Sequence, residues 1–351
     1  MKSRAWRMIT SLTILLVILV VLAGLELWSR LFLEGASIQG ARREVTVKIP
    51  QGATLDDISG ILYSAELIEH PRLFGVTARF LGVDTKLQAG TIRLALGQSL
   101  VELIQALSKA KAVGLPVTFR EGLTVYEYAE ILKQEMGVDS ASFVKACFDS
   151  RLLLKLAVDA PSFEGYLFPD TYFFTGTETP EQMIERMVAN FRVQLPLETN
   201  ERLLAMGLSL NELIALSSIV EWECQIPSEA KIISSVYHNR LKKRMLLQAD
   251  PTVGYALGKG PSRLYLSDLR VDSPYNTYKY PGLPPGAINN PGRRSIEAAL
   301  HPATTPYLFF VAQGNGMHAF TTTFEDHLQA KQKLDELRRA PAMEVEAGTQ
   351  G

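Results

Sequence analysis

Cysteine and paired histidines are scarce in this chain, and their scarcity limits the chemistry that it can use. The 351 residues include only Cys147 and Cys224, which have no metal-ligand spacing. A framework of several disulfides is excluded, whereas one bridge between these two cysteines stays open. The five histidines show no H-E-x-x-H or i, i+4 pairing, so a zinc site has little support. We expect neither a metal nor another cofactor.

An excess of one charge is also missing. Lysine and arginine number 36 against 37 acidic residues, which gives a net charge of −1. Domains that bind nucleic acid are usually strongly basic, so we expect no nucleic-acid partner. The chain also lacks a G-x-S-x-G elbow and a P-loop, so nothing indicates a serine nucleophile or a nucleotide site. A hydrophobic content of 47% excludes a largely disordered chain, and the length fits about two domains.

The first 30 residues contain a long apolar stretch. Lys2, Arg4 and Arg7 precede 18 uncharged residues, 8–25, which is just long enough to cross a bilayer. The stretch exceeds a typical signal-peptide core and no A-x-A-like site follows it, so residues 1–30 are predicted to be a single-pass anchor. The positive-inside rule places the N-terminus in the cytoplasm and everything after about Trp28 on the outer face of the cytoplasmic (inner) membrane. A cleaved signal peptide is the alternative, and it exports the same residues.

Two similar segments lie 70 positions apart in the exported part. Residues 47–62 and 117–132 align without gaps, and both contain the pairs Gly52/Gly122 and Thr54/Thr124. Each segment predicts a short strand, a turn at the glycine, a threonine helix cap and an amphipathic helix. Between them we expect a helix over residues 71–80, a strand over residues 89–97, and a capping box of Ser99 and Glu102.

These patterns predict an α+β protein with two exported domains. The order strand, helix, helix, strand over residues 45–96 resembles a LysM-type module, a fold commonly used to hold glycan chains, and we place that module at residues 40–112. A scaffold of the same fold without a ligand is the alternative. Residues 116–340 form a larger α+β catalytic domain, and residues 341–351 form a disordered tail.

Several stretches of the larger domain have marked compositions. Residues 163–174, FEGYLFPDTYFF, form either core or a wall on which a sugar stacks. Asp250 is a plausible helix N-cap before Pro251, which would account for it structurally. Residues 273–294 hold five prolines and three glycines, so we expect an ordered loop that forms a wall of a binding cleft. Residues 307–312 and 318–323 are predicted to form a hairpin.

Two carboxylates end an apolar helix in the same domain. Ser209 and Glu212 form a capping box, and Glu221 falls on one face with Leu213 and Ile214. Glu223 also has an apolar face, so spacing does not distinguish the two glutamates. One reading is ion pairing with Lys231, Arg240 or Lys242. The other is a general acid, since a carboxylate against apolar surface holds its proton to a higher pH.

Four long motifs, in order along the chain, resemble those of the endolytic murein transglycosylases, the YceG-like family. They are SSIVEWEC, VYHNRLKKRMLLQADPTVGYALG, SPYNTYKYPGLPPGAINNPGRRSIEAALHP and YLFFVAQGNGMHAFTTTFEDH. The resemblance extends to the anchor, the LysM-like module and EGYLFPDTYFF. It implies that Glu221 is the catalytic acid and base, with Glu223 a neighbour in an E-x-E pair. Cys224 stands where relatives often have a small or polar residue, and we attach no function to it.

The resemblance implies a lytic transglycosylase that cleaves the bond between N-acetylmuramic acid and N-acetylglucosamine inside nascent peptidoglycan strands. One carboxyl group suffices, because the substrate's own 6-hydroxyl closes a 1,6-anhydro ring. We expect Gln248, Asp250, Asn276, Tyr278 and Asn290 to hold or shape the substrate site. The partners implied are glycan strands and peptidoglycan synthases at the membrane. Two alternatives stay open: a muramidase that uses Asp250 as second carboxylate, and a non-catalytic scaffold for the synthases.

Overall fold

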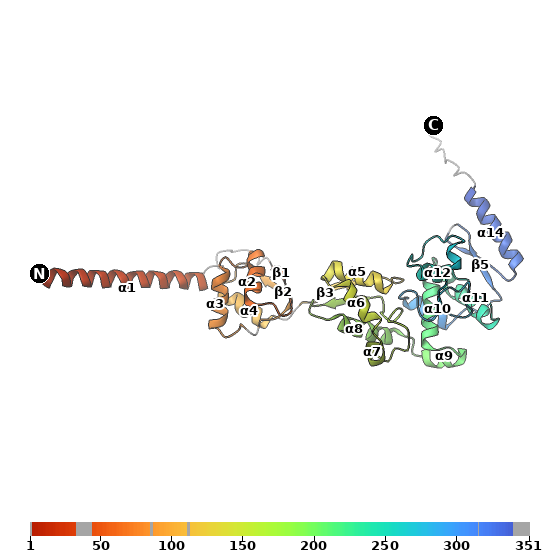
Figure 1. Ribbon diagram of the computed structural model, residues 1–351, viewed down its shortest axis with the longest axis horizontal. Coiled ribbons are helices and arrows are strands. Elements are labelled where there is room, and N and C mark those ends of the chain that lie inside the picture. The colour runs from red at the N-terminus through yellow and green to blue at the C-terminus, as the bar shows by residue number, and fades with distance from the viewer. Residues whose placement is uncertain (1, 33–43, 85–86, 111–112, 315, 340–351) are drawn as a thin grey trace, which may run out of the picture. The chain divides into compact units, whose positions relative to one another are not determined.

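The computed structural model of this protein describes residues 2–32, 44–84, 87–110, 113–314 and 316–339 (Figure 1). The chain divides into two compact units. The first, called here the anchor unit, contains Met1–Pro116 and Tyr172–Glu178. The second, called the larger unit, contains Val117–Thr171 and Thr179–Gly351. Helices and strands both contribute, which confirms the mixed α+β prediction. The predicted tail, residues 341–351, and the first residues of the predicted module, 40–43, lie outside the described residues.

The anchor unit begins with one long apolar helix. This helix, α1, covers Lys2–Phe32, and its segment Leu12–Phe32 is long and apolar enough to cross a membrane. The described side chains from Leu12 to Leu27 are exposed, as they would be on a helix that faces lipid instead of a protein core.

A small module follows α1 in the order that the sequence predicts. Its elements are β1 (Glu44–Ile49), α2 (Leu55–Ser64), α3 (Pro71–Phe80), β2 (Gly90–Ala95) and α4 (Leu100–Lys109). The two strands pair antiparallel, with Val47 opposite Ile92. Alternate strand residues point inward and pack with α2, α3 and α4 in one core that includes Leu62, Phe74 and Ile104.

The two similar segments form the same local structure. Gly52 and Gly122 both have a left-handed backbone, with φ of 77° and 79°. Thr54 and Thr124 both cap the helix that follows through a complete capping box, closed by Asp57 in one copy and by Glu127 in the other. The predicted strand, glycine turn, threonine cap and helix are therefore confirmed twice.

The larger unit is mostly helical. Its helices are α5 (Val125–Met136), α6 (Ser140–Cys147), α7 (Ser150–Lys155), α8 (Pro180–Gln194), α9 (Thr199–Met206), α10 (Leu210–Glu223), α11 (Ala230–Lys242), α12 (Asp250–Ala256), α13 (Arg293–Leu300) and α14 (Phe324–Arg339), with short 3-10 turns η1 (Pro227–Glu229) and η2 (Asp268–Arg270). Its strands β5 (Phe309–Ala312) and β6 (His318–Thr321) form the predicted hairpin. Two short strands, β3 (Leu115–Thr118) and β4 (Thr171–Phe174), lie where the chain passes from one unit to the other. Residues 163, 166, 167, 168, 172 and 174 of the aromatic stretch are buried.

The start of α12 corrects one prediction. Asp250 is the first residue of the helix, and the preceding Ala249 occupies the cap position without a side-chain hydrogen bond. The Asp250 carboxylate instead accepts a hydrogen bond of 2.5 Å from the Tyr278 hydroxyl. Helix capping therefore does not account for this aspartate. The two cysteines are both free, so the disulfide left open by the sequence does not form.

Candidate active site

Helix α10 is the centre of the candidate site. All eight residues from Leu213 to Val220 are buried, because α10 packs against both α11 and α13. The predicted capping box of Ser209 and Glu212 fixes the start of the helix. Its last residues leave the core, and both Glu221 and Glu223 are half-buried. The helix thus holds two carboxylates at one end of a rigid, buried rod.

Glu221 is held by the loop before α13. Its Oε2 accepts a hydrogen bond of 3.0 Å from the backbone N–H of Gly292. On the other side, its Cγ lies 3.6 Å from the position that a Cβ would take on Gly122. Trp222 fixes the same contact, since its indole N–H donates to the Gly122 carbonyl at 2.7 Å. Backbone groups of two loops, at Gly122 and Gly292, therefore meet around the Glu221 side chain.

A second carboxylate, Glu121, lies beside Glu221. Burial raises the pKa of Glu121, the negative charge of Glu221 raises it further, and Arg294 opposes the shift. Arg294 approaches the Glu121 carboxylate to 3.8 Å. Glu121 also rests on Gly292, where a Cβ would lie 1.9 Å from its Oε1. Glu121 was not predicted from the sequence. The internal repeat offers a signal for it, because the position that holds Glu121 in the second copy holds Gln51 in the first.

Glu223 faces a different environment, a cavity of about 340 Å³. Its Oε1 accepts a hydrogen bond of 3.0 Å from the Tyr237 hydroxyl. Desolvation raises the pKa of Glu223 to about 7. The hydrogen bond from Tyr237 opposes this rise, and the negative charge of Asp250 adds to it. Tyr237 was not among the predicted site residues, and its polar role follows from which face of α11 meets α10.

Three of the five predicted substrate-site residues line the Glu223 cavity: Gln248, Asp250 and Tyr278. The hydrogen bond between Asp250 and Tyr278 orients both groups in its wall. Arg240 also lines the cavity, and its guanidinium donates to the carbonyls of Leu246, Leu247 and Leu308. The cavity therefore combines carboxyl and hydroxyl groups with a buried cation, as ligand sites often do.

Asn276 and Asn290, the other two predicted residues, are fully buried in the long loop. The Asn276 amide donates to the carbonyls of Leu269 and Val271, which attaches the loop to the segment before it. The Asn290 Oδ1 accepts from the N–H groups of Gly165 and Leu167. Both positions fit a role in shaping the site, and direct substrate contact stays a prediction.

A buried carboxyl group joins that loop to the aromatic stretch. Glu164 is 2% exposed and accepts hydrogen bonds from the Val125 N–H at 3.0 Å and from the Asn290 amide at 3.1 Å. Desolvation raises the pKa of Glu164 to about 8, although the hydrogen bond from the Val125 N–H lowers it. Glu164 was not singled out from the sequence, because a single acidic residue in an aromatic run does not show whether it is buried.

Ion pairing is not how the two α10 glutamates are accommodated. Within the described part of the chain, neither Glu221 nor Glu223 forms an ion pair with Lys231, Arg240 or Lys242. Their partners are a backbone N–H and a tyrosine hydroxyl. A buried hydrogen-bonded pair nearby is that of His318 and Glu229, with Nδ1 and Oε2 2.7 Å apart.

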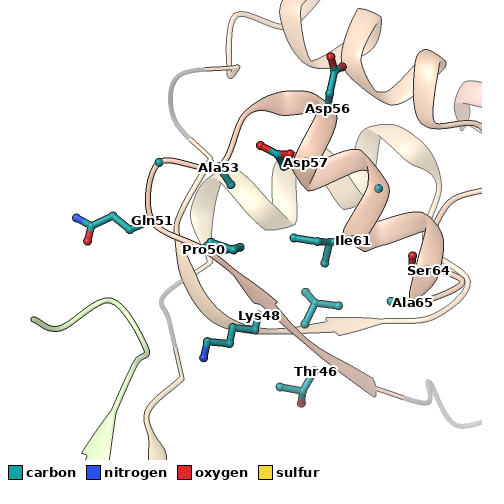
Figure 2. Close-up of a pocket in the computed structure, with 13 residues that line it drawn as sticks. Thr46, Lys48, Pro50, Gln51, Ala53, Asp56, Asp57, Ile61, Ser64 and Ala65 are labelled. Carbon is teal, nitrogen blue, oxygen red and sulfur yellow. The ribbon is translucent and has the colours of Figure 1, made fainter. Parts of the chain in front are cut away.

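The module of the anchor unit has a groove of its own. It has a volume of about 980 Å³ and runs along β1, the turn at Gly52 and α2 (Figure 2). Lys48, Gln51, Asp56 and Ser64 supply polar groups, and Ile61 supplies an apolar one. The Asp57 carboxylate already accepts hydrogen bonds from Thr54 in the capping box, and these bonds lower its pKa.

Comparison with known proteins identifies the group to which this chain belongs. The model of the YceG-like family matches residues 47–333, which include the module and most of the larger unit. The chain belongs to the YceG-like family. Its α10 carboxylates, long loop and hairpin all fall within the matched residues.

Individual YceG-like relatives are similar over most of the chain. An endolytic murein transglycosylase of Bacillus subtilis (strain 168) is 33% identical over 89% of this chain and 91% of its own length. One of Streptococcus pneumoniae (strain ATCC BAA-255 / R6) is 29% identical over 82% of this chain, which spans 58% of that relative. A crystal structure of a YceG-like protein from Listeria monocytogenes is 33% identical, with a TM-score of 0.58 over 82% of this chain and 98% of that one.

Proposed function

We propose that this chain is an endolytic murein transglycosylase. It would cleave the bond between N-acetylmuramic acid and N-acetylglucosamine inside peptidoglycan strands and leave 1,6-anhydro-N-acetylmuramic acid ends. The relatives that bear this name are similar over nearly the whole chain. The observation that carries the proposal is the position of Glu221, whose carboxylate is fixed at the end of a buried helix by the Gly292 N–H.

Glu221 acts as both acid and base in this proposal. Its carboxyl group protonates the glycosidic oxygen, and the C–O bond to the anomeric carbon breaks. The resulting carboxylate accepts the proton of the muramoyl 6-hydroxyl, whose oxygen bonds to the anomeric carbon and closes the anhydro ring. Proton and oxygen balance without water, so no second carboxylate is needed to activate a nucleophile. The bond from Gly292 uses Oε2 and leaves Oε1 for the substrate.

The Glu223 cavity supports a role in binding sugar. Gln248, Asp250 and Tyr278 present amide, carboxylate and hydroxyl groups there, which match sugar hydroxyls and acetamido groups. With a pKa near 7, Glu223 can donate as an acid or accept as a carboxylate at neutral pH. We assign Asn276 and Asn290 to holding the loop that forms this wall.

The anchor unit supports an extracytoplasmic location. We propose that α1 crosses the cytoplasmic (inner) membrane with its N-terminus inside, because Lys2, Arg4 and Arg7 precede the apolar stretch. The module is LysM-like in this proposal, and the groove along β1 and α2 would hold a glycan chain (Figure 2). Peptidoglycan synthases at the membrane are the protein partners that this arrangement would serve.

Product analysis tests the activity. The full chain in detergent is incubated with uncrosslinked glycan strands, and the products are identified by mass spectrometry. We expect anhydro ends, and Glu221→Gln should slow their formation by at least about 100-fold. Glu201→Gln, on the exposed side of α9, removes the same charge and should act like the wild type. Reducing ends without anhydro ends would contradict the transglycosylase.

A muramidase is the second candidate, favoured by the carboxylate of Asp250 in the same cavity as Glu223. In isotopically labelled water, a muramidase would place the label at the new reducing ends, and Asp250→Asn would be as damaging as Glu221→Gln. A non-catalytic scaffold predicts another result: Glu221→Gln would leave the cellular phenotype of the wild type unchanged, whereas removal of the module would abolish it.

A further inference from the structure

A cavity of about 560 Å³ lies between the membrane-length helix and the module in the anchor unit. Ala23, Glu26, Leu27 and Arg30 of α1 form one side of it. Residues of α3 and its cap position form the other side, and Figure 1 shows α3 at the end of the module that α1 enters. The proposed glycan chemistry uses none of these side chains.

The sequence places this cavity at one level of the membrane. The uncharged residues 8–25 cover about 27 Å at 1.5 Å per residue, close to the thickness of a bilayer core. Glu26 is the first charged residue after them, so the headgroup layer begins near Glu26. The cavity therefore extends from the end of the hydrocarbon layer at Ala23 into the headgroup layer at Arg30.

The polar part of the cavity has an excess of positive charge. Arg30 donates to Glu26 at 2.6 Å, which neutralises both groups, and its second nitrogen lies 3.0 Å from Nε2 of His70. Arg72 also lines the cavity and is exposed. Across the described residues, no hydrogen bond or ion pair satisfies the Arg72 guanidinium. The cavity thus contains one uncompensated cation next to a paired one.

The deeper part of the cavity is apolar. Ala23 and Leu27 face it from α1, and Leu73 and Val76 face it from α3. Val76 is 61% exposed, although it lies on a helix whose other face is in the module core. In water, such a wall would be left uncovered, whereas an acyl chain beside α1 would cover it.

We infer that this cavity binds a membrane lipid whose phosphate headgroup has a net negative charge. The phosphate oxygens would accept hydrogen bonds from Arg72 and from the Arg30 side of the cavity, because a guanidinium matches phosphate in a two-pronged geometry. The acyl chain would lie along Ala23, Leu27 and Val76. A lipid is the occupant because one wall of the cavity is the membrane-length helix itself. The bound lipid would hold the module at the outer surface of the membrane.

Lipid retention by the full chain tests this site. The protein is purified in detergent and offered dioleoylphosphatidylglycerol or dioleoylphosphatidylcholine, and bound lipid is counted by native mass spectrometry. We expect phosphatidylglycerol to be retained preferentially. Arg72→Gln should weaken that retention about tenfold, the loss expected for one charge-assisted phosphate contact. Arg79→Gln is the matched control, since Arg79 lies on the same helix, is exposed and does not line the cavity.

Each further result decides for or against the site. Equal retention of the two lipids, or an equal loss in Arg79→Gln, would overturn the inference. Displacement by millimolar inorganic phosphate would also overturn it, because a free anion needs no apolar wall. Displacement by an added polyprenyl phosphate would support a lipid phosphate site and identify that lipid as the better occupant. Unchanged melting temperatures of both variants separate lost binding from lost folding. None of these readouts depends on glycan cleavage.

Discussion

At the scale of single residues, two glutamates two positions apart have different surroundings. A helix turns about 100° per residue, so side chains at i and i+2 point about 200° apart. Glu221 consequently meets Gly292, Gly122 and the charge of Glu121. Glu223 meets Tyr237 and the cavity instead. A division of labour between them follows from helix geometry, with Glu221 as the proposed acid and Glu223 as a group of the sugar site.

The buried carboxyl groups predict how stability depends on pH. Their pKa values rise from 4.5 to about 8 for Glu164 and about 7 for Glu223 on folding. Between 4.5 and those values the folded state binds more protons than the unfolded state, so stability falls as the pH rises. We expect a loss on the order of a few kcal/mol between about pH 5 and about pH 8. Denaturant titrations of the double variant Glu164→Gln/Glu223→Gln should give a flatter profile, and an equally steep one would contradict the assignment.

The hydrogen bonds of Asn290 predict that substitution of this residue lowers the stability of the fold. Its amide donates to the Leu123 carbonyl at 3.0 Å and to Glu164 at 3.1 Å. Asn290→Asp removes both donors in a buried place and should cost about 2–4 kcal/mol in thermal or denaturant unfolding. Asn211→Asp is the control, because that side chain donates a single exposed bond to Pro285. A raised KM with unchanged stability would instead indicate direct contact with substrate.

At the scale of elements, α10 is positioned by the loops around it. Ser218 on α10 accepts from the Ile288 N–H, and its carbonyl accepts from the Asn289 amide. The loop before α13 is thus attached along the buried face of the helix. Because Gly292 ends that loop, the same attachment brings its N–H to Glu221. Rotation or sliding of α10 would therefore break these bonds together.

Two glycines with the same backbone conformation test this packing. Gly165 and Gly207 have φ of 87° and 67°, so alanine is strained at either position. At Gly165 the added Cβ would lie 2.5 Å from Ala287 and 2.6 Å from Ile214, whereas at Gly207 it meets nothing within 4 Å. We expect Gly207→Ala to cost about 1 kcal/mol. Gly165→Ala should cost at least about 2 kcal/mol more by denaturant unfolding, and equal costs would contradict the close packing.

At the scale of the whole molecule, the apolar helix α1 determines the proposed topology. In the proposed topology, α1 crosses the cytoplasmic membrane with its basic end inside, so we expect the larger unit outside the cytoplasm. Protease added to intact spheroplasts should therefore degrade the larger unit, whereas a cytoplasmic control protein stays intact. Protection of the larger unit until the membrane is lysed would contradict this orientation.

Local structure was predicted well from the sequence because its causes are local. The capping boxes at Thr54, Thr124 and Ser209 depend on residues three positions apart. The apolar length of α1 and the period of the module elements likewise depend on neighbouring residues. The assignment of Asp250 to a helix cap was wrong, since a tyrosine 28 positions away competes for its carboxylate. The residues next to Asp250 in the sequence do not indicate such a distant partner.

The sequence by itself determined the capped helices of the module and the start of α10, the hairpin, the membrane-length apolar helix and the choice of two glutamates as candidates. Only the tertiary structure decided their surroundings: Gly292 and Glu121 around Glu221, the cavity around Glu223, and buried roles for Asn276 and Asn290. The physical reason is distance along the chain. Hydrogen bonds within a turn are specified by adjacent residues, whereas desolvation and charge at a site arise from segments that meet only when α10 packs.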